Sequence, residues 1–388
     1  MQRIAQSPLE PGFVQNPYPF YDRMRALGPV VWWEDYGMPC AVSYAAVNAI
    51  MRDRRFGREP IAPLEVADHM QPFYAVEAHS MLELEPPRHT RLRGLVVRAF
   101  TSRRIAALEP EITALAHQLV DALPEGEFDL LTHIAQPLPV IVIARLLGVP
   151  DHMADDLLRW SNAMVAMYQA GRTRAVEDAA SAAARDFSAY LRDHIAARRH
   201  QPADDLITHL IAAEGDDDRL STEELITTCI LLLNAGHEAT VHTIGNGVKA
   251  LLQSGQYTAD APVEPLVEEV LRFDPPLHMF TRIAYSDIDV MGHTLRRGDQ
   301  VACLLAAANR DPGHWDRPND FDPRRVAKPN AAFGAGLHFC VGAPLARLEL
   351  AVMLPILMQR LPGLRLARPP KFAPTYHFHG LSRLDVLA

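Results

Sequence analysis

The sequence predicts a mainly helical protein with small β-sheets, in the α+β class, folded as one domain over residues 1–388. Three observations support this prediction. Apolar residues recur at helical spacing through most of the chain. One helical pattern, from Ser221 to Ser254, has about 34 residues and a length of roughly 50 Å, enough to cross the molecule. Cys340 lies in a glycine-rich loop directly before another helical pattern.

The composition indicates an ordinary globular protein, with 48% hydrophobic and 22% charged residues. We find no repeat, low-complexity stretch or linker. The net charge of -9 argues against nucleic acid as a partner. Residues 1–11 contain no apolar stretch of signal-peptide or membrane-anchor length, and the four cysteines have no paired spacing. We therefore expect a soluble, cytoplasmic protein without a membrane partner.

The N-terminal half begins with an expected amphipathic helix over 20–27, followed by strand-like pieces at 30–33 and 40–42. Residues 57–80 are rich in proline and are expected to form an irregular segment over a pocket. Further helical patterns follow along this half of the chain, over 88–100, 109–123, 137–147, 151–169, 175–198 and 203–213.

The long helix is expected to begin with a capping box, in which Ser221 and Glu224 satisfy each other's backbone N–H groups, and to end at Gly255. Its apolar residues predict a buried helix. The remaining elements are expected in chain order as a helix over 262–273, strands at 288–290 and 300–304, an irregular proline-rich run over 311–333, a helix after Cys340, and a hairpin-like tail around 375–386.

The cysteine loop runs from Phe333 to Pro344 and fills every position of the pattern Phe-Gly-x-Gly-x-His-x-Cys-x-Gly. Its glycines allow positive φ angles and close backbone approach. Pro344 pre-sets φ for a first helical turn. Cys340 therefore lies ahead of a helix N-terminus, where backbone N–H groups and the helix dipole favour a thiolate. A buried, inert cysteine in a tight turn is the alternative, and the complete pattern argues against it.

This loop resembles the haem-ligand loop of the cytochrome P-450 superfamily, the haem-thiolate monooxygenases. The order of elements resembles that fold from end to end, with a long central helix across the haem and the cysteine loop on the opposite side. The resemblance implies that Cys340 is the metal ligand, the axial thiolate of haem b (iron protoporphyrin IX), which favours O–O cleavage. It also implies that Phe333 packs on the ligand side of the macrocycle, that Gly342 belongs to the cofactor-binding loop and that His338 meets a propionate.

The haem propionates require charge-assisted donors, for which arginine serves best. His89 and Arg93 are four residues apart on one predicted helix, so both can point at one target. The resemblance implies that this pair and Arg282 bind the propionates. An exposed salt bridge is the alternative for any one of them taken alone.

Glu269 and Arg272 form a Glu-x-x-Arg pattern. On periodicity alone they lie opposite the apolar stripe of their helix, as a solvent-facing i,i+3 pair. The resemblance implies instead that they are buried together with Arg325 from the proline-rich run. In that arrangement their role is structural, because the network would hold the cysteine loop in place.

Ala235 and Gly236 interrupt the apolar run of the long helix, which indicates close approach of another group. The resemblance implies that dioxygen on iron approaches here, beside a local widening of the helix. It implies that Glu238 is the acid of a proton relay. Ala239 stands where a threonine is expected, and Thr240 comes one residue late. Ordered water, a substrate hydroxyl or Thr240 could replace the missing hydroxyl; alternatively, Ala239 improves packing while Glu238 and water suffice.

The substrate pocket implied by the resemblance has walls from the long helix, from the segment after the Glu-x-x-Arg helix and from the tail. Its expected residues are Leu231, Asn234, Ala235, Leu277, His278, Phe280 and Phe378. Asn234 and His278 suggest a ligand with a polar group, although both could equally be hydrogen-bonded to backbone or water.

The resemblance implies a monooxygenase that inserts one atom of dioxygen into a small apolar organic substrate. Because 388 residues leave no room for a reductase domain, the electrons are expected from a separate ferredoxin-type donor and its reductase. The helix over 88–104 offers that donor a basic surface; a solvated helix face is the alternative. Its arginines are residues 88, 91, 93, 98, 103 and 104.

Two rival functions remain. A peroxide-driven or radical-coupling haem-thiolate enzyme is compatible with the missing threonine at Ala239. A non-catalytic haem sensor or carrier is disfavoured by Glu238 and by the small pair Ala235–Gly236, since these residues suit oxygen activation rather than storage.

Overall fold

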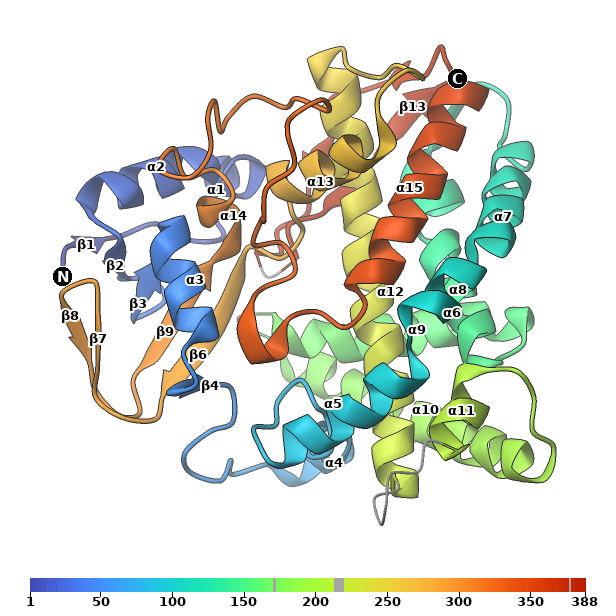
Figure 1. Cartoon of the computed structure of the whole chain (residues 1–388), viewed down its shortest axis with the longest axis horizontal. Helices are drawn as coiled ribbons and strands as arrows, with labels where there is room; N and C mark the ends of the chain where they lie inside the picture. Colours follow the sequence, from blue (N-terminus) through green and yellow to red (C-terminus); the bar gives the residue numbers. More distant parts are fainter. Residues whose placement is uncertain (170–171, 213–219, 377) are drawn as a thin grey trace.

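The computed structural model describes residues 1–169, 172–212, 220–376 and 378–388. A large helical part surrounds the longest helix, α12, and a smaller part beside it holds the main β-sheet with α1–α3 (Figure 1). The helices are α1 (Pro11–Gln15), α2 (Tyr18–Leu27), α3 (Tyr44–Arg52), α4 (Gln71–Glu77), α5 (Arg88–Ala99), α6 (Ser102–Ala107), α7 (Glu109–Asp121), α8 (Pro137–Leu147), α9 (Ala154–Val165), α10 (Arg174–His200), α11 (Leu206–Ala212), α12 (Thr222–Ser254), α13 (Val263–Phe273), α14 (Leu305–Ala308) and α15 (Ala343–Arg360).

The main sheet has six strands in the order β1-β2-β3-β9-β6-β4, within the described ranges. Its strands are β1 (Arg3–Ile4), β2 (Val30–Trp33), β3 (Met38–Ala41), β4 (Phe56–Gly57), β6 (Met279–Ala284) and β9 (Gln300–Leu304). The smaller sheets are β10-β13-β5, β11-β12 and β7-β8. Their strands are β5 (Glu127–Asp129), β7 (Ile288–Val290), β8 (His293–Leu295), β10 (Arg365–Leu366), β11 (Lys371–Phe372), β12 (Leu381–Arg383) and β13 (Asp385–Leu387).

Helix α12 begins and ends where its sequence predicts. Ser221 and Glu224 form a complete capping box, and Gly255 ends the helix in the left-handed conformation. Gly245 and Gly247 let neighbours approach, because a Cβ there would lie 2.6 Å from Leu131 and 2.7 Å from Val270. The helix is consequently surrounded by others over most of its length.

Several local predictions were wrong. The segment over 57–80, expected to be irregular, contains α4, and the single basic helix over 88–104 is two helices, α5 and α6. The break lies at Thr101, whose hydroxyl accepts the backbone N–H of Arg104 and so caps α6. Helix α3 and strand β6 were not predicted at all.

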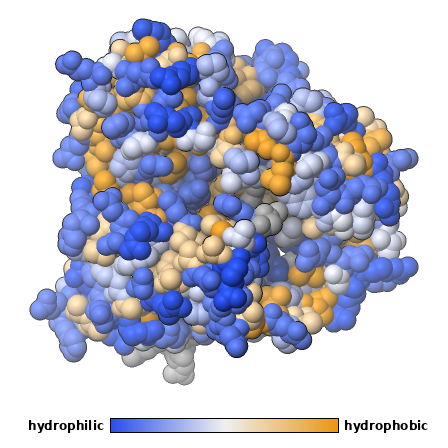
Figure 2. Space-filling view, turned by 180° about the vertical axis from the view of Figure 1, so that it is seen from behind, coloured by the Kyte–Doolittle hydropathy of each residue, from blue (hydrophilic) through white to orange (hydrophobic). Residues whose placement is uncertain are grey.

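The surface opposite to the view of Figure 1 is hydrophilic over most of its area, with apolar side chains in scattered groups and a hollow near its centre (Figure 2). Among the described residues, no helix combines the length and hydropathy needed to span a bilayer.

Candidate active site

The cysteine loop folds back on itself just before α15. Gly334 and Gly336 have φ values of +69° and +71°, and the backbone N–H of Cys340 donates to the carbonyl of Phe333 over 3.0 Å. A side chain at Gly336 would collide with the backbone of α3, because its Cβ would lie 2.1 Å from the carbonyl oxygen of Met51. Only glycine therefore allows the loop to lie against α3.

The Cys340 thiol lies at the N-terminal end of α15. Burial raises its pKa, while backbone N–H bonds from Gly342 and Ala343 and the charge of Arg93 act in the opposite direction. These groups stabilise a thiolate and would keep doing so in a metal-bound sulfur. Phe333 lies under the guanidinium of Arg347, whose central carbon is 4.7 Å from the ring centroid.

Basic side chains collect around this loop. His89 of α5 is fully buried, and neither of its ring nitrogens has a hydrogen-bond partner among the described residues. Its ring is 4.4 Å from that of His338, whose Nε2 lies 2.9 Å from a carboxylate oxygen of Glu85. Burial and the neighbouring cations lower the pKa of His89 to about 4. A neutral, unsatisfied imidazole in this position would donate readily to an anionic ligand.

Among the described residues, the guanidinium groups of Arg93 and Arg282 donate hydrogen bonds only to backbone carbonyls. Arg93 donates to the carbonyl of Phe339 over 2.5 Å, and Arg282, 3% exposed, donates to its neighbour Thr281 over 2.8 Å. Burial, together with the charge of Arg58, lowers the pKa of Arg282. A buried guanidinium without a carboxylate, as at Arg282, is costly, so this cluster fits the two carboxylates of a haem.

Arg58 belongs to the same cluster and was missed in the sequence. It follows β4, donates to Glu83 over 2.7 Å, and its buried Nε has no hydrogen-bond partner among the described residues. Its place depends on the pairing of β4 with β6, the strand that carries Arg282. No local pattern around an arginine in a proline-rich segment could have indicated this.

The Glu-x-x-Arg pair is buried, with 2% of Glu269 and 1% of Arg272 exposed. Arg272 binds both carboxylate oxygens of Glu269, at 2.7 and 2.8 Å, and Arg325 adds a third bond at 3.0 Å. Remaining donors of both arginines bind backbone carbonyls between residues 309 and 320. The network thus ties α13 to the irregular run that leads into the cysteine loop.

One face of α12 is open at the middle of the molecule, and we call it the open face: Leu231, Asn234, Ala235 and Ala239. Ala235 is exposed although its helix is surrounded by others. Gly236, in contrast, faces α8 and allows the two helices to pack closely, because a Cβ there would lie 3.4 Å from Ile143. The helix is α-helical from Thr222 to Ser254, without the expected widening.

Thr240 is turned away from this face. Its hydroxyl donates to the carbonyl of Gly236 over 2.8 Å and contacts Glu349 of α15. Burial raises the pKa of Glu349 to about 8, against the effect of this contact, so the carboxyl carries a proton near neutral pH. The Thr240 hydroxyl is therefore bound in a helix-to-helix contact.

Glu238 lies beside the open face and is paired along its own helix. One carboxylate oxygen is 3.0 Å from Nε2 of His242, and the other is 3.9 Å from Nδ1 of His237. Burial would raise the pKa of Glu238, but the hydrogen bond from His242 and the electrostatic interactions with His242 and His237 lower it below its usual value. The predicted acid is thus held as a carboxylate.

The predicted pocket residues do not all meet. Leu277 and Phe378 pair in an isolated β-bridge, and Phe280 is half-buried. Asn234 points to α9, where its amide lies 3.8 Å from the sulfur of Met164. His278 is completely buried among aromatic rings and bonds to Tyr21 over 2.8 Å, so its side chain has no access to a pocket and its predicted place in the wall was wrong.

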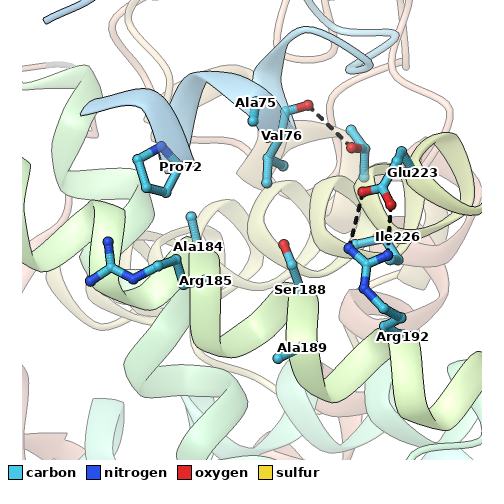
Figure 3. A pocket seen from close by; sticks show the side chains of 11 residues that line it. Pro72, Ala75, Val76, Ala184, Arg185, Ser188, Ala189, Arg192, Glu223 and Ile226 are labelled. Carbon is cyan, nitrogen blue, oxygen red and sulfur yellow. Dashed lines mark hydrogen bonds and ion pairs between the residues drawn. The ribbon is translucent and has the colours of Figure 1, made fainter. Parts of the chain in front are cut away.

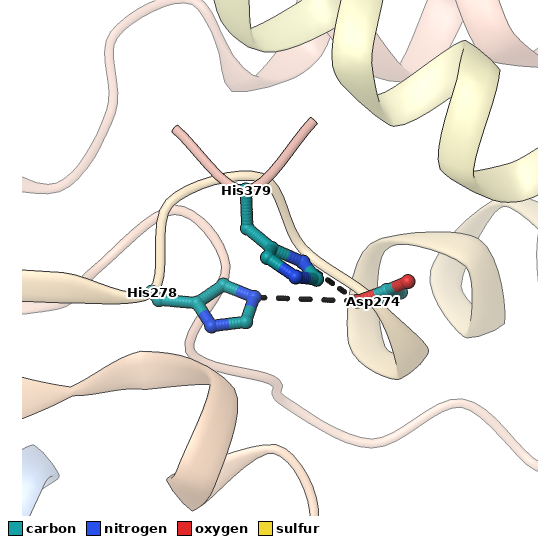
Figure 4. A group of neighbouring side chains, drawn as sticks. All are labelled: Asp274, His278 and His379. Carbon is teal, nitrogen blue, oxygen red and sulfur yellow. Dashed lines mark ion pairs between the residues drawn. The ribbon is translucent and has the colours of Figure 1, made fainter. Parts of the chain in front are cut away.

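His278 instead belongs to a buried group with Asp274 and His379, which we call the Asp274 cluster (Figure 4). Three potential ligand atoms of these residues lie within 4.8 Å of one another. However, Lys249 already pairs with Asp274 over 2.9 Å and is the strongest influence lowering its pKa against the effect of burial. A divalent ion would add two uncompensated charges to a dry site, so the cluster does not suit a metal.

A separate hollow of about 280 Å³ lies between α4, α10 and the first turns of α12 (Figure 3). Arg192 and Glu223 close one side of it through bonds of 2.6 and 3.2 Å. It is about nine residues, or roughly 13 Å, along α12 from Ala235 and contains none of the predicted pocket residues.

Comparison with known proteins identifies the family to which this chain belongs. A family model described as cytochrome P450 matches residues 263–365. The biotin biosynthesis cytochrome P450 of Bacillus subtilis (strain 168) is 36% identical over 392 residues, covering 99% of each chain. The chain belongs to the cytochrome P450 family. PikC, a cytochrome P450 monooxygenase of Streptomyces venezuelae, is 38% identical over 96% of this chain and 91% of its own.

Solved cytochrome P450 structures share the fold. P450BioI, in complex with an acyl carrier protein ligated to hexadec-9Z-enoic acid, has a TM-score of 0.91 at 35% identity, with coverage of 97% of this chain and 99% of its own. CalO2 has a TM-score of 0.90 at 31% identity, with coverage of 99% and 98%. The protein is thus a cytochrome P450 monooxygenase, which acts with haem, dioxygen and an organic substrate.

Proposed function

We propose that this cytochrome P450 holds haem b between the open face of α12 and the cysteine loop, with Cys340 as the axial ligand. The observation that carries the proposal is the Cys340 sulfur, which receives two backbone N–H bonds beside a cluster of buried basic side chains. The propionates would be held by His89, Arg93, Arg282, His338 and Arg58. When bound, the haem supplies oxygen activation and insertion into a C–H bond of the substrate.

The substrate in this proposal is a small apolar molecule bound near Leu231, Ala235 and the Leu277–Phe378 pair. Glu238 delivers protons, and ordered water fills the role of the absent hydroxyl at Ala239, because Thr240 is bound elsewhere. The relatives act in different contexts: one is named for biotin biosynthesis and another is vitamin D(3) 25-hydroxylase of Pseudonocardia autotrophica. This spread does not favour a particular substrate.

The proposed electron donor is a ferredoxin-type protein, reduced by its own reductase in the cytoplasm. Arg98 and Arg103 are exposed on α5 and α6, and Arg93 of the same basic segment touches the residue before Cys340. A negatively charged protein bound there would lie close to the cysteine side of the haem. P450BioI, in contrast, was solved with an acyl carrier protein, so a carrier-bound substrate is the second candidate for an acidic partner.

The deciding experiment is the carbon monoxide spectrum of the reduced protein. Wild-type protein should show the strongly red-shifted band of thiolate ligation, and Cys340→His should bind haem but lose that band. A wild-type protein without the band would contradict Cys340 ligation. Substrate-dependent oxygen consumption, measured with the donor pair and again with peroxide alone, separates a monooxygenase from a peroxide-driven enzyme and from a sensor.

A further inference from the structure

A polar cavity adjoins the Glu238–His242 pair. It has a volume of about 220 Å³ and lies between α9, α12 and the C-terminal tail. Gln136, Asn162, Gln169 and Thr375 supply polar groups to its wall. Since one water occupies about 30 Å³ of liquid, the cavity accommodates several waters with suitable hydrogen-bond partners.

The titratable side chains in the described part of the cavity wall are His237, Glu238 and His242, all from α12. Burial lowers the pKa of His237 to about 4, so it is neutral at ordinary pH. Glu238 is held as a carboxylate by His242 over 3.0 Å. Glu238 and His242 are therefore the hydrogen-bonded titratable pair of the described cavity wall.

The imidazole of His242 is fixed from the other side by the tail. Gly380 has no side chain, and a Cβ there would lie 1.9 Å from Nδ1 of His242. The φ angle of Gly380 is not in the left-handed region. A glycine is therefore required here because the His242 ring leaves no space for a side chain, and not because of the backbone conformation. The His242 ring is consequently held between Gly380 and Glu238.

We propose that His242 is a positioning residue of the proton path, which holds the Glu238 carboxyl between the polar cavity and the open face of α12. In this arrangement, which rests on the proposed function, cavity water is the proton source. The Glu238 carboxylate takes a proton from a cavity water, which is reprotonated from bulk solvent through the other cavity waters, and passes this proton to the open face; His242 donates an N–H hydrogen bond to Glu238 throughout. Gly380 maintains the arrangement by leaving space for the ring.

The first test compares His242→Leu with His242→Gln in the haem-loaded protein. Leucine removes the donor, so kcat should fall about tenfold, part of the range for general acid–base catalysis. KM should stay unchanged, and the solvent deuterium isotope effect on kcat should rise as proton delivery becomes limiting. Glutamine keeps an N–H donor and should recover most of the loss. Failure of glutamine to recover it would overturn the donor role.

The second test leaves all three titratable side chains intact. Gly380→Ala should displace the His242 ring and reproduce the effects of His242→Leu, including the larger isotope effect. Gly363→Ala is the matched control, because a Cβ at Gly363 meets nothing within 4 Å. Equal behaviour of the two alanine variants would contradict the proposal.

A third measurement does not depend on turnover. The pKa of the Glu238 carboxyl, followed by ¹³C NMR of labelled protein and identified by its loss in Glu238→Gln, should rise in His242→Leu and in Gly380→Ala. An unchanged pKa would overturn the proposed contact even in an active monooxygenase. If the pKa rises as expected while the carbon monoxide band is absent, the contact stands and the proposed function fails.

Discussion

Glu349 shows how a single buried residue can make stability depend on pH. Burial raises its pKa in the folded protein from 4.5 to about 8, so the folded state binds a proton that the unfolded state releases above its ordinary range. The contribution of this group to stability is complete below about pH 4.5 and is lost as the pH rises through 8. Glutamine at this position would be neutral at every pH.

We expect Glu349→Gln to remove this dependence. The variant should be more stable than the wild type at pH 8, by on the order of 2–4 kcal/mol, and the difference should shrink toward pH 5. Urea unfolding at both pH values measures it, with the exposed Glu109→Gln as control. Parallel curves for wild type and Glu349→Gln would contradict a raised pKa.

The departure at Ala239 leads to a second prediction about one residue. Ala239 belongs to the open face, whereas the Thr240 hydroxyl is bound to Gly236. Ala239→Thr should therefore raise the product formed per electron pair, and Thr240→Ala should leave it within about twofold of the wild type. The measurement is product yield against reductant consumed. Loss of coupling in Thr240→Ala alone would assign the relay to Thr240.

At the scale of elements, the sequence predicted those helices whose bounds are determined by local residues. Helix α12 has a capping box and a terminal glycine, and α8 occupies the predicted 137–147. Helices α3 and α4 were missed because they are short and depend on contacts with distant segments. The Glu269–Arg272–Arg325 network could be predicted only from the family motif, since periodicity alone places the pair in solvent. Arg58 and Glu349 had no local signal, because each is defined by a neighbour far along the chain or across the fold. His242 has the i,i+4 spacing to Glu238, but its contact with Gly380 depends on the distant tail.

The basic segment of α5 and α6 leads to a prediction about partner binding. Arg88 and Arg91 already pair with Glu59 and Glu224, whereas Arg98 and Arg103 are exposed. Charge reversal of both exposed residues should slow the first electron transfer about tenfold at low salt, and less at high salt, because exposed charges are screened.

The measurement is the rate of reduction by a ferredoxin under carbon monoxide, at several ionic strengths. The control is the double variant Arg296→Glu/Arg297→Glu, which changes the net charge by the same amount on the loop after β8. If this control slows electron transfer as much as the α5–α6 variant, the effect comes from net charge and not from docking.

The whole molecule is tied together at the Asp274 cluster. Tyr18 of α2 donates to Asp274 over 2.7 Å, Lys249 of α12 lies 2.9 Å from its other oxygen, and Nδ1 of His379 lies 3.5 Å from the oxygen that Tyr18 binds. Four segments that are distant in sequence therefore meet at one buried carboxylate.

Removing either charge should destabilise the protein. Asp274→Asn and Lys249→Met should each lower the free energy of unfolding by about 3–5 kcal/mol, because a buried charge loses its partner. The double variant should lose less than the sum of the two. Additive losses would mean that the two charges are not coupled. Added zinc should leave the melting temperature of the wild type unchanged.

The same cluster determines when the fold can be completed during synthesis. His379 bonds to the carbonyl of Val14 over 3.2 Å, across 365 positions of the chain. Until residue 379 has left the ribosome, Asp274 and Lys249 lie in a partly built protein whose N-terminal helices have no tail to bind. Contacts of such high sequence separation slow folding. A chaperone that holds the nascent chain would therefore be expected to stay bound at least until residue 379 has left the ribosome.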